Sequence, residues 1–255
     1  MNYFAPQTAA ERYAKGRPYF HPLVIERVKV YLQLVQPVDL ALDVACGTGL
    51  STMALKPVAQ RIIGVDASAA MLAQALPDAQ ITCQLALAEQ LPADDASCDL
   101  MTVSRQGIHW FNQAAFLDEA WRVLKPDAWL VVYDNFFTTH MIEDETFRQR
   151  KLDGYLQRYP PPPRNSYEMN DVQAAAHGFG LRHQEPYENQ QRFTLDELVD
   201  YATTQSGVNA AVEVGAERIE DVRAWMSAQY VPFFAGRTHS TFLFRGVIFY
   251  LQKQN

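Results

Sequence analysis

The stretch Leu40–Ser51, LALDVACGTGLS, joins a short apolar run to two glycines that stand one residue apart. The apolar run, Leu40–Ala45, predicts a buried strand, and Leu50–Leu55 predicts a helix directly after the glycines. Glycine lacks a Cβ atom, so Gly47 and Gly49 let the backbone turn tightly and approach a ligand closely. The sequence therefore predicts a ligand-binding turn between a strand and a helix.

Apolar runs and helical patterns alternate around this turn as far as Asp134. Further strands are predicted at Arg61–Asp66, Ile81–Leu87, Cys98–Ser104 and Trp129–Tyr133, and helices at Leu23–Leu34, Ala69–Ala75 and Phe116–Leu124. Such alternation predicts a doubly wound α/β fold, in which helices cover both faces of a largely parallel sheet.

The alternation ends after Asp134, where helical patterns predominate. Helices are predicted at Glu143–Tyr159, Asp171–His177, Leu195–Thr204 and Ala216–Gln229, and strands within Leu181–Phe193 and at Ser240–Leu251. We therefore expect an N-terminal lid and helix (1–36), a core that contains the sheet (37–135, 171–193 and 240–255) and helical cap insertions (136–170 and 194–239).

The composition favours an ordinary globular protein. The chain of 255 residues is 48% hydrophobic and 20% charged, which is unlike a disordered chain. Its 22 basic and 29 acidic residues give a net charge of −7 without a long basic run, which argues against a nucleic-acid partner. No stretch approaches the roughly 18 apolar residues of a membrane span, and no signal peptide is visible. We expect a cytoplasmic location without a membrane partner; the oligomeric state stays open.

The three cysteines, Cys46, Cys83 and Cys98, stand in or beside apolar runs. No two of them have the spacing of metal ligands, so we expect no metal site. Free cysteine packs as a small hydrophobic residue, and the sequence predicts that role for all three.

Two classes of cofactor bind at a strand, a glycine turn and a helix. Nicotinamide and flavin sites use G-x-G-x-x-G, whose third glycine allows close packing of the helix on the strand. Thr52 stands where that third glycine belongs. Asp43, within the first strand, would repel a pyrophosphate but suits a ligand with a positive charge near the turn.

The segment Asp43–Gly49, DVACGTG, resembles the first signature of class I S-adenosylmethionine-dependent methyltransferases. Three later segments are similar to family motifs in the same order: AEQLP at Ala88–Pro92, SCDL at Ser97–Leu100 and RVLKP at Arg122–Pro126. The resemblance covers residues 10–135 well and is greatest to the small-molecule branch, which includes trans-aconitate and quinone-biosynthesis methyltransferases. It implies a Rossmann-like seven-stranded mixed sheet with an antiparallel last strand, a helical cap insertion and S-adenosyl-L-methionine as cofactor.

The resemblance also implies a set of cofactor-binding residues. These are Tyr13, Arg17, Asp43, Ala45, Cys46, Gly47, Gly49, Asp66, Ala67, Met71, Ala88, Glu89 and Ser104. The ionised carboxylate of Asp66 offers two oxygens to a ribose diol, although it can also cap the next helix. Asp43 can instead cap loop amides, and Met71 can be plain core. Many relatives carry a polar residue where this chain has Leu87, which leaves adenine recognition to the neighbouring Ala88 amide and Glu89.

The segment Ser104–Phe111 should lie beside the transferred methyl group, because ligands of doubly wound folds bind beyond the carboxyl ends of the strands. His109 is a candidate catalytic base, since imidazole titrates near neutral pH, or else an orienting donor or a wall residue. Arg105 is a candidate partner for an acceptor carboxylate, or a solvated surface residue. Trp110 is a candidate wall of the acceptor pocket, or a core residue.

The N-terminal segment Tyr13–Tyr19, YAKGRPY, resembles the lid of this branch, which closes over the bound cofactor. Tyr19 is then a candidate contact to the acceptor, and the alternative is an arm that only packs on the first helix. We expect a methyltransferase that acts on a small-molecule acceptor by O-methylation of a carboxylate or hydroxyl. The alternatives are an inactive cofactor-binding protein, an NAD-dependent oxidoreductase and an RNA methyltransferase.

Overall fold

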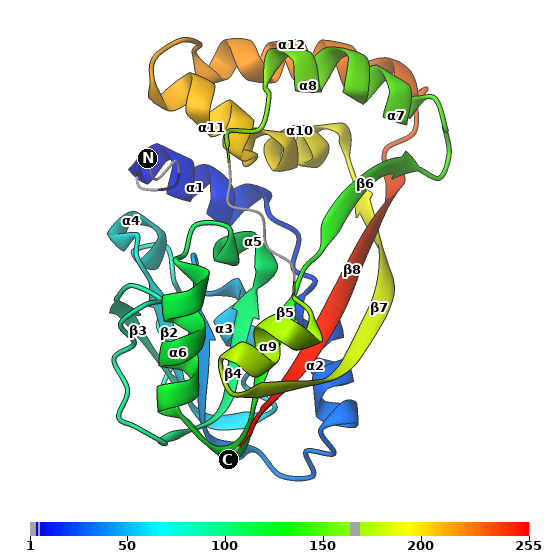
Figure 1. Ribbon diagram of the computed structural model, residues 1–255. Coiled ribbons are helices and arrows are strands. Elements are labelled where there is room, and N and C mark those ends of the chain that lie inside the picture. Colours follow the sequence, from blue (N-terminus) through cyan, green and yellow to red (C-terminus); the bar gives the residue numbers. More distant parts are fainter. Residues whose placement is uncertain (1–3, 5, 164–168, 255) are drawn as a thin grey trace. The chain divides into compact units, whose positions relative to one another are not determined.

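The computed structural model describes residue 4 and residues 6–163 and 169–254 (Figure 1). The chain forms two compact units. Unit 1 comprises Met1–Pro18, Asn135–Pro163 and Glu188–Arg245, and unit 2 comprises Tyr19–Asp134, Arg164–Tyr187 and Gly246–Asn255. Two long strands, β7 (Phe179–Phe193) and β8 (Ser240–Lys253), contribute residues to both units. In the part of the chain that is described, no helix is long and apolar enough to cross a lipid bilayer.

Unit 2 contains the doubly wound sheet. Its parallel strands are β1 (Val38–Val44), β2 (Ala59–Asp66), β3 (Ile81–Leu85), β4 (Cys98–Ser104) and β5 (Leu124–Tyr133). They are hydrogen-bonded in the order β3-β2-β1-β4-β5, and β8 follows β5 in the antiparallel direction. The chain reverses its direction of travel across the sheet between β1 and β4, where doubly wound folds bind ligands. The predicted fold class and its antiparallel last strand are confirmed.

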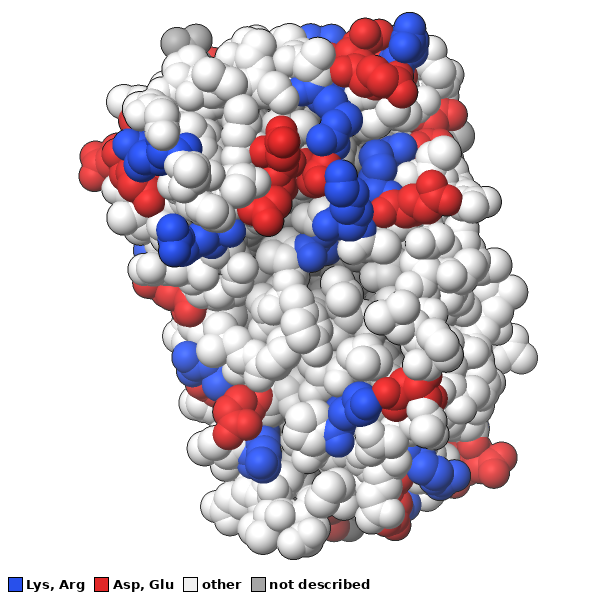
Figure 2. All heavy atoms as spheres, turned by 180° about the vertical axis from the view of Figure 1, so that it is seen from behind, with Lys and Arg blue, Asp and Glu red and all other residues white. Residues whose placement is uncertain are grey.

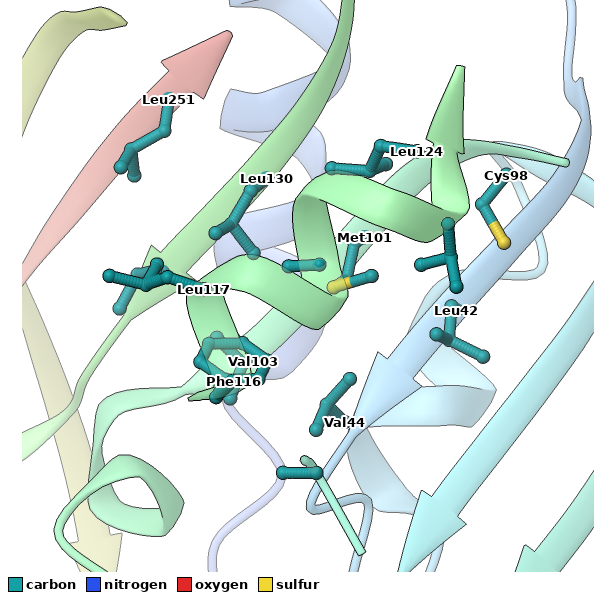
Figure 3. Close-up of a cluster of buried hydrophobic side chains, with 14 of the residues drawn as sticks. Leu42, Val44, Cys98, Met101, Val103, Phe116, Leu117, Leu124, Leu130 and Leu251 are labelled. Atoms are coloured by element: carbon teal, nitrogen blue, oxygen red, sulfur yellow. The ribbon is translucent and has the colours of Figure 1, made fainter. Parts of the chain in front are cut away.

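Both faces of this sheet are covered by helices. The helices of unit 2 are α2 (His21–Tyr31), α3 (Leu50–Ala54), α4 (Ala69–Leu72), α5 (Arg105–Ile108), α6 (Gln113–Val123) and α9 (Asp171–Ala176). On one face, Phe116 and Leu117 of α6 join a cluster with Leu42, Met101 and Leu130 of the strands (Figure 3). Successive strand residues point to opposite faces. The other face therefore buries their neighbours against α2 and α3.

Unit 1 contains mostly helices. They are α1 (Gln7–Gly16), α7 (Phe147–Arg150), a π-helical turn (Lys151–Tyr155), α8 (Leu156–Arg158), α10 (Leu195–Thr203), α11 (Ser206–Glu213) and α12 (Ile219–Phe234). The additional strand β6 (Phe136–Met141) pairs antiparallel with the first half of β8, with Phe137 opposite Phe244. Aromatic rings of β6, β8 and α10 pack together here, with the Phe137 and Phe244 centroids 5.0 Å apart.

Several elements differ from the expectation. Over the residues that the structure describes, the sheet has eight strands instead of the expected seven, because β6 was not predicted. The helix expected over Glu143–Tyr159 begins only at Phe147, since Asp144 accepts hydrogen bonds from the backbone and hydroxyl of Thr146 and holds the chain in a turn. Helices α1, α5 and α11 were also not predicted.

Candidate functional site

In unit 2, the backbone of the glycine turn is accessible to a ligand at Gly47. Ala45, Gly47 and Gly49 have φ values of +56°, +56° and +83°, which belong to the left-handed region. A Cβ atom placed on Gly47 would meet nothing within 4 Å. The backbone here therefore borders open space, as a turn that receives a ligand requires. Gly49 forms the N-terminal boundary of α3.

Asp43 is fully buried beneath this turn. Its carboxylate accepts hydrogen bonds from Ser51 Oγ at 2.6 Å, Thr52 Oγ1 at 2.7 Å and Thr102 Oγ1 at 2.9 Å. Burial raises the pKa of Asp43 to about 6, although the three hydroxyls oppose that rise. The carboxylate thus ties α3 and β4 to β1, and it does so through hydroxyls instead of the loop amides that the sequence offered as an alternative.

Asp66 holds the turn from the end of β2. Its Oδ2 accepts a hydrogen bond from the Gly47 amide at 2.9 Å, and its Oδ1 accepts one from the Ser68 amide at 2.8 Å. Burial raises its pKa, and both amides oppose the rise. Each carboxylate oxygen retains a further lone pair, so Asp66 keeps the capacity to accept from a diol. Ser68 itself caps α4 by accepting from the Met71 amide at 3.3 Å.

A shallow depression of about 570 Å³ begins one residue beyond Asp66. Its lining residues are Ala67, Leu85, Ala86, Leu87, Gln90, Leu91 and Pro92. Leu85 and Leu87 are 64% and 57% exposed, so apolar surface is open to solvent beside a carboxylate. Such a combination suits a ligand with a flat apolar ring and a polar sugar. The sequence analysis had pointed to Ala67 and to the position of Leu87, whereas Leu85 was missed, because strand patterning alone does not show that this leucine is exposed.

Three other residues are predicted to lie near adenine, and that role stays a prediction. Met71 and Ala88 are buried in unit 2 and are not among the residues that line the depression. The Glu89 carboxylate accepts a hydrogen bond from the backbone amide of Asn112 at 2.6 Å. Asn112 is the residue that caps α6, so Glu89 connects the segment after β3 to that helix.

Thr48 is a residue that sequence reasoning missed. The residue is 7% exposed, and its buried Oγ1 has no hydrogen-bond partner among the residues that the structure describes. A buried hydroxyl without a partner costs free energy, unless a ligand satisfies it. The open Gly47, the orphaned Thr48 hydroxyl and the Asp66 carboxylate together fit a zwitterionic ligand that carries a ribose.

The segment after β4 packs directly on the turn. A Cβ atom on Gly107 of α5 would lie 2.6 Å from the Ala45 Cβ, so only glycine permits this approach. Ser104 precedes α5, and Cys46 is buried at 4% exposure. His109 follows α5 and is half-buried, while Trp110 is 38% exposed. The side chain of Arg105 lies outside the described part of the chain.

A histidine–tyrosine pair lies near the same edge of the sheet and was not predicted. Tyr133 ends β5 and is in register with Ser104 at the end of β4. Its hydroxyl lies 2.8 Å from Nδ1 of His21, the first residue of α2. The His21 ring also stacks on Phe20, with centroids 4.2 Å apart.

The residues of the expected lid are divided between the units. Tyr13 and Arg17 belong to unit 1, and Tyr19 belongs to unit 2, where it is 51% exposed. The Arg17 guanidinium lies 4.7 Å from the Tyr13 ring centroid and 5.4 Å from that of Tyr201. Arg17 therefore contributes to the packing of α1 on α10. Its role toward the cofactor stays a prediction.

Comparisons with known proteins agree with this geometry. Residues 42–132 match the family model described as a methyltransferase domain. A Dictyostelium discoideum protein described as a methyltransferase is 32% identical over 95 residues, which are 37% of this chain and 36% of the relative. The malonyl-[acyl-carrier protein] O-methyltransferase of a Marinomonas species is 36% identical over 124 residues, which are 44% of this chain and 43% of the relative. In both, the match spans less than half of the relative's length.

One solved structure, assigned as a type II methyltransferase from Anaeromyxobacter dehalogenans, has a TM-score of 0.65 at 23% identity. The likeness covers 88% of this chain and 94% of that one, and it shows a shared fold. The family match spans the glycine turn, Asp66 and the strands β2 to β4 that position them. Residues 42–132 therefore form a methyltransferase domain, on a fold that the chain shares with a solved methyltransferase structure.

Proposed function

We propose that the protein transfers a methyl group from S-adenosyl-L-methionine to an oxygen of a small-molecule acceptor, a carboxylate or a hydroxyl. The observation that carries this proposal is the contact between Asp66 and the Gly47 amide. It joins a diol-binding carboxylate to an open glycine turn, next to an apolar depression. These three features correspond to the ribose, methionine and adenine parts of the cofactor.

The cofactor, when bound, supplies an electrophilic methyl group on a positively charged sulfur. The chain's own residues bind and orient: Asp66 accepts from the ribose, and the backbone of Gly47 with the Thr48 hydroxyl receives the methionine part. Methyl transfer is an in-line displacement, so alignment of the acceptor supplies much of the rate. A carboxylate acceptor needs no base, whereas a hydroxyl must lose its proton to a group such as His109.

The relative from Marinomonas supports an oxygen acceptor, because its name describes O-methylation of a malonyl group. On this proposal Arg105 pairs with an acceptor carboxylate, Trp110 and Tyr19 border the acceptor, and the protein needs no nucleic-acid or membrane partner. Charge on the face seen in Figure 2 favours a small acceptor over RNA, since Lys and Arg are interspersed there with Asp and Glu.

The test is calorimetric titration of the purified protein with S-adenosylmethionine, S-adenosylhomocysteine and NADH. We expect micromolar binding of the first two and none of NADH. A second assay incubates the protein with methyl-labelled cofactor and a panel of small carboxylic acids and phenols. Transfer of label to a carboxylic acid or phenol supports the proposal; NADH binding alone overturns the cofactor assignment. Cofactor binding without turnover on any acceptor would favour an inactive binding protein.

A further inference from the structure

The histidine–tyrosine pair lies at a part of the sheet that the proposed cofactor features leave open. The depression lies at the end of β3, Asp66 ends β2, and the glycine turn follows β1. On the proposed function, the adenine, ribose and methionine parts therefore follow one another along the carboxyl ends of these three strands. The next strands in the order are β4 and β5, and Tyr133 ends β5 in register with Ser104 of β4. An acceptor beside the glycine turn therefore faces the strand ends where this pair lies.

The two members of the pair differ in their access to a ligand. Tyr133 is fully buried, whereas His21 is half-buried. The Tyr133 hydroxyl lies 2.8 Å from Nδ1 of His21. The second ring nitrogen, Nε2, lies across the imidazole ring from this contact. The pair therefore joins an accessible imidazole to a buried phenol, through one of the two nitrogens only.

Aromatic rings fix the orientation of the His21 ring. Phe20 stacks on it with centroids 4.2 Å apart, and Tyr133 meets it edge to face with centroids 5.8 Å apart. The Tyr19 ring is 6.2 Å away, and Tyr19 is the exposed residue that is proposed to border the acceptor. Aromatic faces stabilise a neighbouring cation, which favours the imidazolium that forms when His21 takes a proton.

The chain directly after Tyr133 is held in place by β7 and β8. The Asp134 carbonyl accepts a hydrogen bond from the Tyr187 hydroxyl, and its carboxylate accepts one from the Val247 amide at 2.9 Å. A Cβ atom on Gly246 would overlap the Asp134 carbonyl oxygen, so only glycine lets β8 approach so closely. The Tyr133 hydroxyl thus has a rigid support, as a group that orients another side chain requires.

We propose that His21 removes the proton from a hydroxyl acceptor and that Tyr133 holds the imidazole in the tautomer that this step requires; the assignment rests on the proposed function. Nδ1 donates its hydrogen to the Tyr133 oxygen, which leaves the lone pair on Nε2. The acceptor oxygen bonds to the methyl carbon with the electron pair of its O–H bond, the pair of the broken carbon–sulfur bond stays on sulfur, and the proton passes to Nε2. The imidazolium then gives this proton to water. On this assignment His109 orients the acceptor.

The tautomer is measured on the full chain without cofactor or acceptor, by long-range ¹H–¹⁵N NMR of histidine-labelled protein. The His21 signal is identified by its absence from His21→Asn. In the native protein the neutral ring should carry its hydrogen on Nδ1, and Tyr133→Phe should lose that preference, because no phenol oxygen then accepts from Nδ1. A hydrogen on Nε2 in the native protein would overturn the assignment, because that nitrogen could not then take a proton.

Tyr250→Phe is the matched control for Tyr133→Phe. It removes another buried phenol hydroxyl of unit 2, which donates to Glu185 at 3.0 Å. The His21 tautomer should be the same in this variant as in the native protein. A change of tautomer in both variants would show that the loss of any buried hydroxyl disturbs the ring, and it would overturn the specific role of Tyr133.

Turnover is compared on a phenol and on a carboxylic acid. The amide of His21→Asn can still donate to Tyr133, but it cannot take a proton. Turnover on the phenol should therefore fall about 100-fold or more, and turnover on the carboxylic acid should stay within about threefold, because a carboxylate arrives without a proton. Affinity for S-adenosylhomocysteine should be kept. Equal losses on both acceptors would overturn the base, and so would a native protein that methylates carboxylic acids alone.

Added imidazole separates a base from a structural residue. In His21→Ala it should restore turnover on the phenol at least about tenfold, because a free imidazole can take the proton, and in His109→Ala it should restore none. Absence of rescue in His21→Ala that still binds S-adenosylhomocysteine would overturn the assignment. If the native protein methylates no acceptor, the proposed function fails and the base with it, while the NMR measurement still decides whether Tyr133 fixes the tautomer of His21.

Discussion

Asp43 of β1 accepts a hydrogen bond from Thr102 of the neighbouring strand β4 at 2.9 Å, at the place where the strand order reverses. Two further hydroxyls complete its surroundings, and burial raises its pKa to about 6. A carboxyl in the unfolded chain titrates near 3.9, so the folded protein binds more protons between these values. Acidification toward pH 5 therefore stabilises the fold through this group.

Asp43→Asn should remove that part of the pH dependence. In the native protein the contribution of Asp43 to the free energy of unfolding should fall by about 1 kcal/mol between pH 5 and pH 7. Denaturant titrations of both proteins at the two pH values measure the difference. Parallel pH profiles would show that Asp43 is not the responsible group.

Asp66→Ala should weaken S-adenosylmethionine binding by roughly 1–3 kcal/mol, because the ribose loses an acceptor and the Gly47 amide loses its partner. Ser68→Ala is the control, since it removes the cap of α4 and leaves the Asp66 carboxylate in place. Calorimetry measures both. An affinity that Asp66→Ala leaves unchanged would remove the ribose assignment.

His109→Gln should lower turnover about 100-fold or more while cofactor affinity is kept, if His109 removes the acceptor proton. His177→Gln is a matched control, because His177 is a half-buried histidine of the same unit whose Nδ1 contacts Asp118 at 2.6 Å. The prediction is tested by comparing the steady-state rates of the native protein and both variants, with the acceptor identified from the panel of carboxylic acids and phenols. A small loss would leave His109 as a wall residue.

Gly107→Ala should destabilise the protein by about 1–3 kcal/mol, since the new Cβ would meet the Ala45 Cβ at 2.6 Å. Adding Ala45→Gly removes the obstructing atom and also relieves a left-handed φ of +56°. The double variant should therefore regain most of the lost stability, which thermal or denaturant unfolding measures. Additive losses would mean that α5 and the turn do not contact each other as described.

Arg17→Ala should loosen α1, because the guanidinium packs on the rings of Tyr13 and Tyr201. We expect a loss of about 0.5–2 kcal/mol and faster amide exchange in α1 and α10. Lys15→Ala is the comparison: Lys15 pairs with Asp200, but its side chain is 70% exposed, so its loss should change little. Unaltered exchange in Arg17→Ala would contradict the packing role.

The sequence predicted those features that depend on local chemistry. The glycine turn, the carboxylate at the end of β2 and the Ser68 cap are each determined by residues that are close in the chain, and the structure has them where the motifs indicated. Glu89 shows the limit of such reasoning. Its motif predicts a position beside adenine, but it gives no indication that the carboxylate also accepts a hydrogen bond from the amide of Asn112, 23 residues away.

The features that were missed depend on distant segments. Strand β6 forms because Phe136–Met141 finds the first half of β8, more than a hundred residues later. The His21–Tyr133 pair joins the start of α2 to the end of β5, and neither residue stands in a motif. Thr48 was not selected because its position between the two glycines indicates only a turn. That its hydroxyl is unsatisfied is evident only once the burial of this residue is known.

The late position of β8 in the sequence has a consequence for synthesis. This strand pairs with β5, β6 and β7, so three earlier strands must wait for Ser240–Lys253 before their hydrogen bonds are complete. On the ribosome, the nascent chain would expose the unpaired edge of β5 and the aromatic side of β6 until those residues emerge. Contacts so distant in sequence slow folding. Until β8 has been synthesised, chaperones should therefore encounter a sheet with an unpaired edge. The pairing of β8 with that edge then completes the sheet.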